Sequence, residues 1–156
     1  MITTDEVQGQ APRAYERLCQ PFETTFTDIR GGVEITFISG EQVTRRLNEA
    51  LGVGGWSFRI LRHDINADAD EAWALGEIVA EVDGKCVTRQ QFGSQKIKRS
   101  RSSGAPLDLG FDLKGAATDA MKKCASLLGV GLYLSRKQPP RPSAARAGGT
   151  GMHRSA

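Results

Sequence analysis

The sequence predicts one α+β domain in which a β-hairpin and a helix precede a three-stranded antiparallel meander and a long C-terminal helix. Strand-like runs are joined by two-residue turns, and segments with helical periodicity and capping signals lie on both sides of those runs. A chain of 156 residues is long enough for one ordinary core but too short for two. We expect a flexible lead over residues 1–14, a folded domain over 15–137 and a disordered basic tail over 138–156.

A short helix and a β-hairpin come first. The stretch PRAYERLCQPF predicts a helix that Pro21 closes, with Leu18 and Cys19 facing inward. Two runs rich in threonine and β-branched residues then flank Gly31 and Gly32. A two-residue Gly-Gly connection between such runs is typical of a β-hairpin.

The next helix is predicted over the stretch SGEQVTRRLNEALG. Ser39 can cap its start with Gln42 three residues on, as in a capping box, and Gly52 supplies a left-handed stop. Arg45 and Arg46 are expected toward the polar side. The expected buried stripe consists of Val43, Leu47, Ala50 and Leu51.

Three strand-like runs, WSFRILRHDI, AWALGEIVAEV and KCVTRQQFG, follow this helix. The second and third are joined by Asp83 and Gly84, a strong two-residue hairpin signal, so the three runs predict an antiparallel meander. The following stretch, SQKIKRSRSSGAPLDLG over 94–110, is polar and basic, and its apolar residues follow neither the helical nor the strand repeat. It is therefore expected to be a mobile loop.

The clearest helix is DLKGAATDAMKKCASLLG, in which small and apolar residues recur at spacings of three and four. Asp112 near its start and Gly129 just beyond its end suit the helix dipole and the C-cap. Its solvent side is expected to carry Lys114, Thr118, Lys122 and Lys123. Its apolar face is expected to hold Leu113, Ala116, Ala117, Ala120, Met121, Cys124 and Leu128, packed on one face of a single sheet.

Several function classes are disfavoured by composition. The longest apolar run, LLGVGLYL, is well short of the roughly 18 residues that a membrane-spanning helix needs. No basic segment followed by an apolar one stands at the amino terminus, so we expect a cytoplasmic, nucleoid-associated protein or one in an organelle matrix. Cys19, Cys86 and Cys124 are widely spaced and form no metal or redox motif, which predicts reduced and mostly buried thiols.

Positive charge is concentrated in the last part of the chain. Residues 1–95 hold 9 Lys and Arg against 15 Asp and Glu, whereas residues 96–156 hold 12 against 3. This asymmetry indicates a polyanionic partner. The basic cluster of Lys96, Lys98, Arg99 and Arg101, followed by Lys122 and Lys123, could track a phosphate backbone; a solvated loop and a charged helix face are the alternative.

Six aromatic residues are candidates either for the core or for stacking on bases, which is worth roughly 1–3 kcal/mol per base. Most of them lie in alternating strands and are expected in the core, and Phe37 is the one retained as a possible base contact. The six are Phe37, Trp56, Phe58, Trp73, Phe92 and Tyr133.

Catalysis and cofactor binding find little support. His63 is the only histidine in the expected folded domain, since His153 falls in the tail, and no nucleophile motif accompanies it. There is no P-loop and no G-x-G-x-x-G. The chain is therefore expected to be no enzyme and to need no cofactor.

An acidic stretch, DINADADE, tests the possibility of a metal site. It spaces Asp64, Asn66, Asp68 and Asp70 like the start of a calcium loop. The pattern fails where Ala69 replaces the turn glycine and where Leu75 replaces the bidentate glutamate. We expect no metal, and a metal-dependent nuclease using the three aspartates stays a minor alternative.

The sequence from FISGEQVTRRLNEALGVGGWSFRI through a meander to GAATDAMKKCASLLGVGLYL resembles the Rad52 family of single-strand annealing proteins, in its bacterial, phage or DdrA-like branch. The matching pieces are the joint at Phe37 to Gly40, the pair Asn48-Glu49, the pair Gly55-Trp56, and the Thr118-Asp119 helix with its two lysines. The resemblance covers roughly residues 15–137. A double-stranded RNA-binding module has the same helix–meander–helix order and is the alternative from another class.

The resemblance implies a β-β-β-α core that packs side by side into a ring, with single-stranded DNA in a basic groove around the outside. It places Lys122 and Lys123 on the groove floor, Arg30 near it on the first hairpin, and Phe37 along its wall. It also places further DNA contacts in the loop from Lys96 to Arg101. The full set of DNA-binding candidates is Lys122, Lys123, Arg30, Phe37, Lys96, Lys98, Arg99, Arg101, Arg45, Arg46 and Lys114.

Two departures from the family pattern limit what the resemblance implies. Relatives often carry another basic residue one turn after the lysine pair, where this chain has Ser126. The long C-terminal region of eukaryotic members has no counterpart, so a recombinase or a single-strand-binding protein is only a possible partner. The expected role is strand annealing in recombination and repair, in which gripped phosphates leave base edges free to pair.

Overall fold

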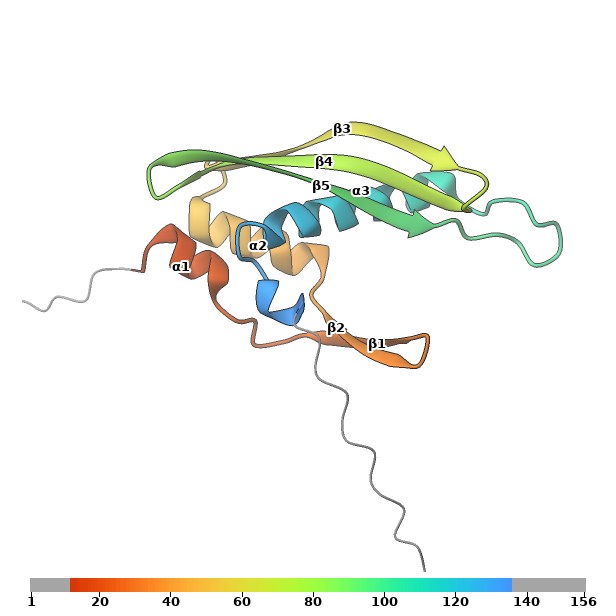
Figure 1. The fold of residues 1–156 in the computed structure, drawn as a ribbon, viewed down its shortest axis with the longest axis horizontal. Coiled ribbons are helices and arrows are strands. Elements are labelled where there is room, and N and C mark those ends of the chain that lie inside the picture. The colour runs from red at the N-terminus through yellow and green to blue at the C-terminus, as the bar shows by residue number, and fades with distance from the viewer. Residues whose placement is uncertain (1–11, 136–156) are drawn as a thin grey trace, which may run out of the picture.

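A long helix lies along one face of a three-stranded antiparallel sheet in the computed structural model, which describes residues 12–135 (Figure 1). The α+β class, the hairpin, the meander and the terminal helix are confirmed. The predicted lead and tail fall almost entirely outside the described residues. The elements are α1 Ala14–Cys19, β1 Phe26–Arg30, β2 Val33–Phe37, α2 Gly40–Leu51, β3 Trp56–Asn66, β4 Glu71–Val82, β5 Lys85–Lys96, α3 Leu109–Ser126 and the short 3-10 helix η1 Leu132–Ser135.

The meander has the strand order β3-β4-β5, with antiparallel pairing throughout. Asp83 and Gly84 have φ angles of 49° and 78°, so the turn between β4 and β5 is the tight, left-handed kind that the sequence predicts. The Asp83 carboxylate also accepts hydrogen bonds from the backbone amides of Ala14 (2.8 Å) and Tyr15 (3.2 Å). The turn therefore caps the start of α1.

Small residues let α3 approach the sheet closely. On β4 the even-numbered residues Ala72, Ala74, Ile78 and Ala80 are buried against α3. A Cβ atom added to Gly93 on β5 would lie 2.7 Å from the Ala120 Cα atom, and closer still to the Ala120 nitrogen and the Ala116 oxygen. Strand and helix backbones are thus in direct contact at this point.

The hairpin of β1 and β2 is a separate two-stranded sheet, which corrects the expectation of a single sheet. Gly31 and Gly32 form its turn with φ angles of 57° and 78°. The capping box of α2 is confirmed: Ser39 Oγ accepts from the Gln42 amide (3.1 Å), and Gln42 Oε1 accepts from the Ser39 amide (2.8 Å). In the predicted stripe, Val43, Leu47 and Ala50 are buried, but Leu51 is only partly so.

The turn from α2 into β3 shows why Asn48, Gly55 and Trp56 occur together. The Asn48 side chain accepts a hydrogen bond from Trp56 Nε1 at 2.8 Å. A Cβ atom on Gly55 would lie 3.0 Å from the Leu51 carbonyl carbon and closer to its oxygen, so no side chain fits there. These local contacts fix the angle at which β3 leaves the helix.

The segment expected as a mobile loop over 94–110 is ordered by hydrogen bonds. β5 continues to Lys96, and Arg99 pairs with Pro106 in a β-bridge. Within the segment the Leu107 amide donates to Lys98 (2.8 Å) and the Ser100 amide donates to Ala105 (2.9 Å). The polar composition of this segment gave no sign of the short hairpin, because the hairpin is held by backbone groups and not by a side-chain pattern.

The start of α3 also differs from the prediction. The helix begins at Leu109, and Asp108 caps it by accepting from the Phe111 amide at 2.9 Å. Asp112 lies in the first turn, as the sequence predicts, but its side chain is fully buried. One of its carboxylate oxygens accepts from the Lys98 amide at 3.3 Å, so it ties the basic segment to the helix.

Two further expectations, on the aromatic core and on the thiols, are wrong in part. Phe92, expected in the core, is 58% exposed on the face of the sheet away from α3. Cys124 is buried, whereas Cys19 is half-buried and Cys86 is exposed. Between residues 12 and 135, no helix is both long enough and apolar enough to cross a membrane.

Candidate nucleic-acid interface

One face of α3 carries a line of aromatic, basic and hydroxyl side chains. Phe111, Lys114, Thr118 and Lys122 follow one another at spacings of three and four residues, so they lie on the same side of the helix. The line rises about 16 Å along the helix axis. The opposite face, which includes Ala116, is buried against the sheet. We call these four residues the α3 stripe.

The β1–β2 hairpin brings two predicted site residues to the C-terminal end of the α3 stripe. The Lys122 ammonium lies 5.4 Å from the centre of the Phe37 ring, within the range of a cation–π contact. Phe37 itself stacks on Phe26, with ring centres 5.7 Å apart. Strand alternation places Arg30 on the same face of the hairpin as these two rings.

The surroundings of Lys122 are electrostatically unusual. Partial burial lowers the pKa of Lys122 below its ordinary value; the Asp119 carboxylate raises it, and the nearby Arg30 charge lowers it further. Arg30 is exposed and forms an ion pair with Asp28 at 3.0 Å, whereas half-buried Lys122 forms no ion pair among the described residues. Lys122 is therefore the cation that is left for an anion at this position. The structure thus brings Arg30, Phe37 and Lys122 together.

Lys123 differs from its neighbour. Its ammonium forms an ion pair with Asp119 Oδ2 at 2.9 Å. The same oxygen accepts a hydrogen bond from the Ser94 amide on β5, also at 2.9 Å. Lys123 is exposed, but its charge is balanced within the chain.

The basic segment after β5 meets the N-terminal end of the α3 stripe. The Lys98 ammonium lies 4.6 Å from the centre of the Phe111 ring, and Phe111 is 50% exposed. Arg99 pairs with Asp70 at 2.7 Å and donates to the Gly104 oxygen, while Lys96 donates to the Ala69 oxygen. Arg101 is exposed in the turn of the segment. Of this cluster, Lys98 therefore lies at the stripe, while Lys96 and Arg99 are engaged in holding the segment.

The hairpin and the basic segment project from the same end of the molecule (Figure 1). The stripe is thus bordered by cations from two other parts of the chain, Arg30 at one end and Lys98 at the other.

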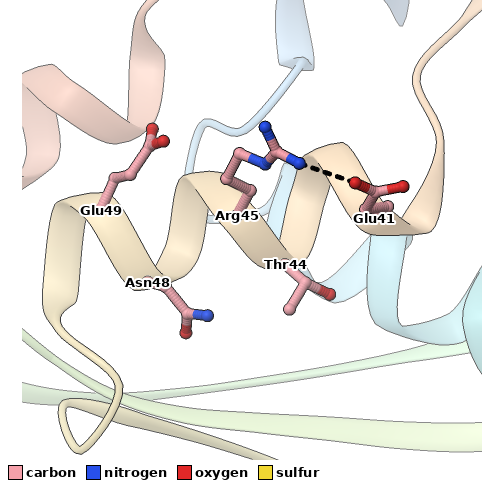
Figure 2. A pocket seen from close by; sticks show the side chains of 5 residues that line it. All are labelled: Glu41, Thr44, Arg45, Asn48 and Glu49. Carbon is pink, nitrogen blue, oxygen red and sulfur yellow. Dashed lines mark hydrogen bonds and ion pairs between the residues drawn. The ribbon is translucent and has the colours of Figure 1, made fainter.

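The two arginines on α2 are placed differently from the stripe. Arg45 pairs with Glu41 at 2.7 Å beside an open depression of about 490 Å³, which Glu49 also lines (Figure 2). With two carboxylates against one guanidinium, this surface does not favour phosphate. Arg46 is half-buried: its guanidinium donates to the backbone oxygens of Arg17, Gln20 and Pro21 and lies over the Phe22 ring, so it holds the end of α1.

The aspartates considered for a metal do not form a site. Asp70 is engaged by Arg99, and over residues 12–135 no group of three or more His, Cys, Asp or Glu side chains could hold an ion together. The alternative of a metal-dependent nuclease thus gains no support from the geometry.

Two aromatic residues of this surface were missed by sequence reasoning. Phe26 was not singled out, although its place opposite Phe37 follows from the hairpin register. Phe111 was assigned neither to the predicted loop nor to the predicted helix, although it stands three and seven residues before Lys114 and Thr118. Extending the helical spacing backwards from Lys122 would have found it.

An antiparallel meander covered by one helix, a separate hairpin and a basic, aromatic stripe between them define a β-β-β-α protein with a surface suited to a polyanion. Residues 10–144 match the model of the Rad52/22 family double-strand break repair protein. The chain therefore belongs to the Rad52/22 family, which assigns it to DNA repair and recombination. No curated protein matches the chain with significance.

Proposed function

We propose that this protein binds single-stranded DNA along the α3 stripe and anneals complementary strands while assembled as a ring. The observation that carries the proposal is the convergence of Lys122, Arg30 and Phe37 at the end of a helix face that also presents Lys114. Cations interleaved with aromatic rings are the chemistry that single strands require, because phosphates need charge and bases need flat apolar surfaces.

The geometry suggests how the strand is held. Lys98, Lys114 and Lys122 are spaced along the stripe, so they can neutralise successive phosphates of an extended strand. Phe111 and Phe37 lie beside the first and last of these lysines and offer ring surface for stacking. Phosphate contacts of this kind fix the path of the strand without reading its sequence.

Annealing follows from holding the backbone and leaving base edges accessible. An extended strand has no internal hairpins to melt before it samples pairing with a second strand. The energy comes from pairing itself, about 1.4 kcal/mol per stacked step, and no bond is made or broken. A recombinase or a single-strand-binding protein remains a possible partner in this role.

Binding of fluorescent oligo-dT, compared with duplex DNA and duplex RNA of equal length, tests the proposal. We expect tighter binding of oligo-dT and faster pairing of two complementary oligonucleotides in the presence of the protein. Tighter binding of duplex RNA would favour the double-stranded RNA-binding alternative. Equal or tighter binding of duplex DNA would contradict single-strand recognition.

The lowered pKa of Lys122 predicts a pH dependence. The ammonium loses its proton at a lower pH than an ordinary lysine, so oligo-dT affinity should fall on the alkaline side before free lysine titrates. A Lys122→Arg variant keeps its charge and should retain affinity to higher pH. Anisotropy titrations between neutral pH and pH about 10 measure this, with Lys114→Arg as the matched control. The same alkaline loss in the Lys122→Arg protein would contradict the assignment.

A further inference from the structure

A groove lies at the end of the molecule opposite the hairpin. It is bounded by α1, by the turn between β4 and β5, and by the C-terminal end of α3, and its volume is about 440 Å³ (Figure 1). Tyr15, Val87 and Leu127 contribute apolar surface, and Tyr15 and Leu127 are 55% and 46% exposed. We call it the α1 groove.

The rim of the α1 groove is positively charged. Arg13, Lys85 and Arg89 line it, and within residues 12–135 none of the three forms an ion pair with a carboxylate. The one acidic residue there, Asp83, is already bonded to the amides that begin α1. An apolar floor beside uncompensated cations fits a partner that offers an apolar side chain next to an acid.

The outer face of the β1–β2 hairpin offers that combination. Ile29 is 72% exposed and stands directly opposite Glu34 in the strand register, so the two side chains are neighbours. Both point to the side of the hairpin opposite to Phe37 and Arg30, because side chains alternate along a strand. A two-stranded ribbon is marginal on its own, and this one exposes apolar side chains on both faces.

We propose that the Ile29–Glu34 face of one copy docks into the α1 groove of the next copy, with Ile29 on the apolar floor and Glu34 paired with Lys85. The two surfaces are unlike and lie at opposite ends of the molecule, so the contact is head-to-tail, and such a contact forms a ring when the rotation between successive copies closes. This inference rests on the ring in the proposed function. It leaves the Phe37 face of each hairpin available to DNA.

Sedimentation velocity of the full chain, with and without oligo-dT, measures the contact. Ile29→Asp should lower the mass from an oligomer toward a single chain, since it places an acid on the apolar floor. Val53→Asp is the matched control, because Val53 is 79% exposed on the turn after α2 and should keep the wild-type mass. An Ile29→Asp protein with the wild-type mass would overturn the contact.

Charge reversal separates the contact from a folding defect. Glu34→Lys and Lys85→Glu should each weaken assembly, and the two substitutions together should restore it. Failure of the double variant to recover mass, when each single variant has lost it, would overturn the pairing. A carbodiimide crosslink between Glu34 and Lys85 in mixed ¹⁴N and ¹⁵N protein should join chains of different label; a crosslink confined to chains of one label would overturn it.

Oligo-dT binding distinguishes this inference from the proposed function. A wild-type protein that is monomeric with and without oligo-dT would overturn both the ring and the contact, whereas its DNA affinity would still decide single-strand binding. An oligomer that survives every hairpin and groove variant would overturn the contact alone. If Lys85→Glu lost oligo-dT affinity while its mass stayed that of the wild type, the cations of the α1 groove would bind DNA instead of a neighbouring copy. That result would also overturn the proposed contact.

Discussion

Replacing Lys114 and Lys122 together by alanine is expected to weaken oligo-dT binding about 25-fold at 0.1 M salt. Each lysine that neutralises a phosphate of a single strand contributes about 0.7 to the slope of log affinity against log salt concentration. Removing two such lysines lowers the slope by about 1.4 for each bound subunit, and the loss shrinks as the salt concentration approaches about 1 M. Fluorescence anisotropy at several salt concentrations measures both the affinity and the slope.

The control for this result is a cation on the other side of the sheet. Arg62 is exposed and pairs in register with Leu75, on the face away from α3. Arg62→Ala should leave the slope unchanged, whereas Lys122→Ala alone should lower it by about 0.7. An unchanged slope in the double lysine variant would show that the strand does not follow the α3 stripe. If Arg62→Ala and Lys122→Ala lowered the slope equally, the effect would come from the overall charge of the protein and not from a phosphate contact of Lys122.

Gly93→Ala is expected to destabilise the fold by about 1–3 kcal/mol or more, because the added methyl group has no space. It would lie 2.7 Å from the Ala120 Cα atom, and the backbones of both elements would have to separate. Urea unfolding should show a lower midpoint with an unchanged dependence on denaturant. A midpoint equal to that of the wild type would mean that α3 does not pack on β5 as closely as described.

Gly110→Ala adds the same methyl group, but it is expected to leave the stability of the fold unchanged or to raise it. Gly110 lies in the first turn of α3, and the nearest atom to an added Cβ is Asp108 Oδ1 at 3.4 Å, an ordinary contact. Alanine favours helix over glycine by up to about 1 kcal/mol, so stability should rise slightly or stay the same. A fall as large as that in Gly93→Ala would mean that both effects reflect a general intolerance of α3.

Elements governed by short-range chemistry were predictable from the sequence. The capping box of Ser39 and Gln42 acts across three residues, and the turn at Asp83 and Gly84 acts across two. Both features depend on backbone angles that their residue types prefer, so the pattern alone indicates them. Strand order in the meander then follows from short connections.

Features that depend on distant residues were not predictable. Arg46 has the polar character of a surface residue, yet its guanidinium is held by carbonyl groups that lie more than twenty positions away. Asp112 sits where an exposed acid would suit the helix dipole, but the returning strand end covers it. Helical or strand periodicity carries no information about such contacts.

The candidate site was also predictable only in part. Lys122 was visible in the charge pattern and Phe37 among the aromatic residues, whereas Arg30 came from the family resemblance alone. The structure places Lys122 beside both of the other two. The basic cluster after β5 was visible as charge, but only the fold shows that Lys98 reaches the stripe while Arg99 holds Asp70. Their role in DNA binding stays a prediction until it is measured.

The bond from Asp83 to the start of α1 has a consequence for the order of folding. A helix of six residues is too short to persist by itself, and Arg13 at its start provides no side-chain cap. Its cap comes instead from a residue 69 positions later, which adopts its place only when β4 and β5 have met. The surface formed by α1 therefore depends on the finished sheet, so the docking that we propose at the α1 groove requires that β4 and β5 of that chain have already paired.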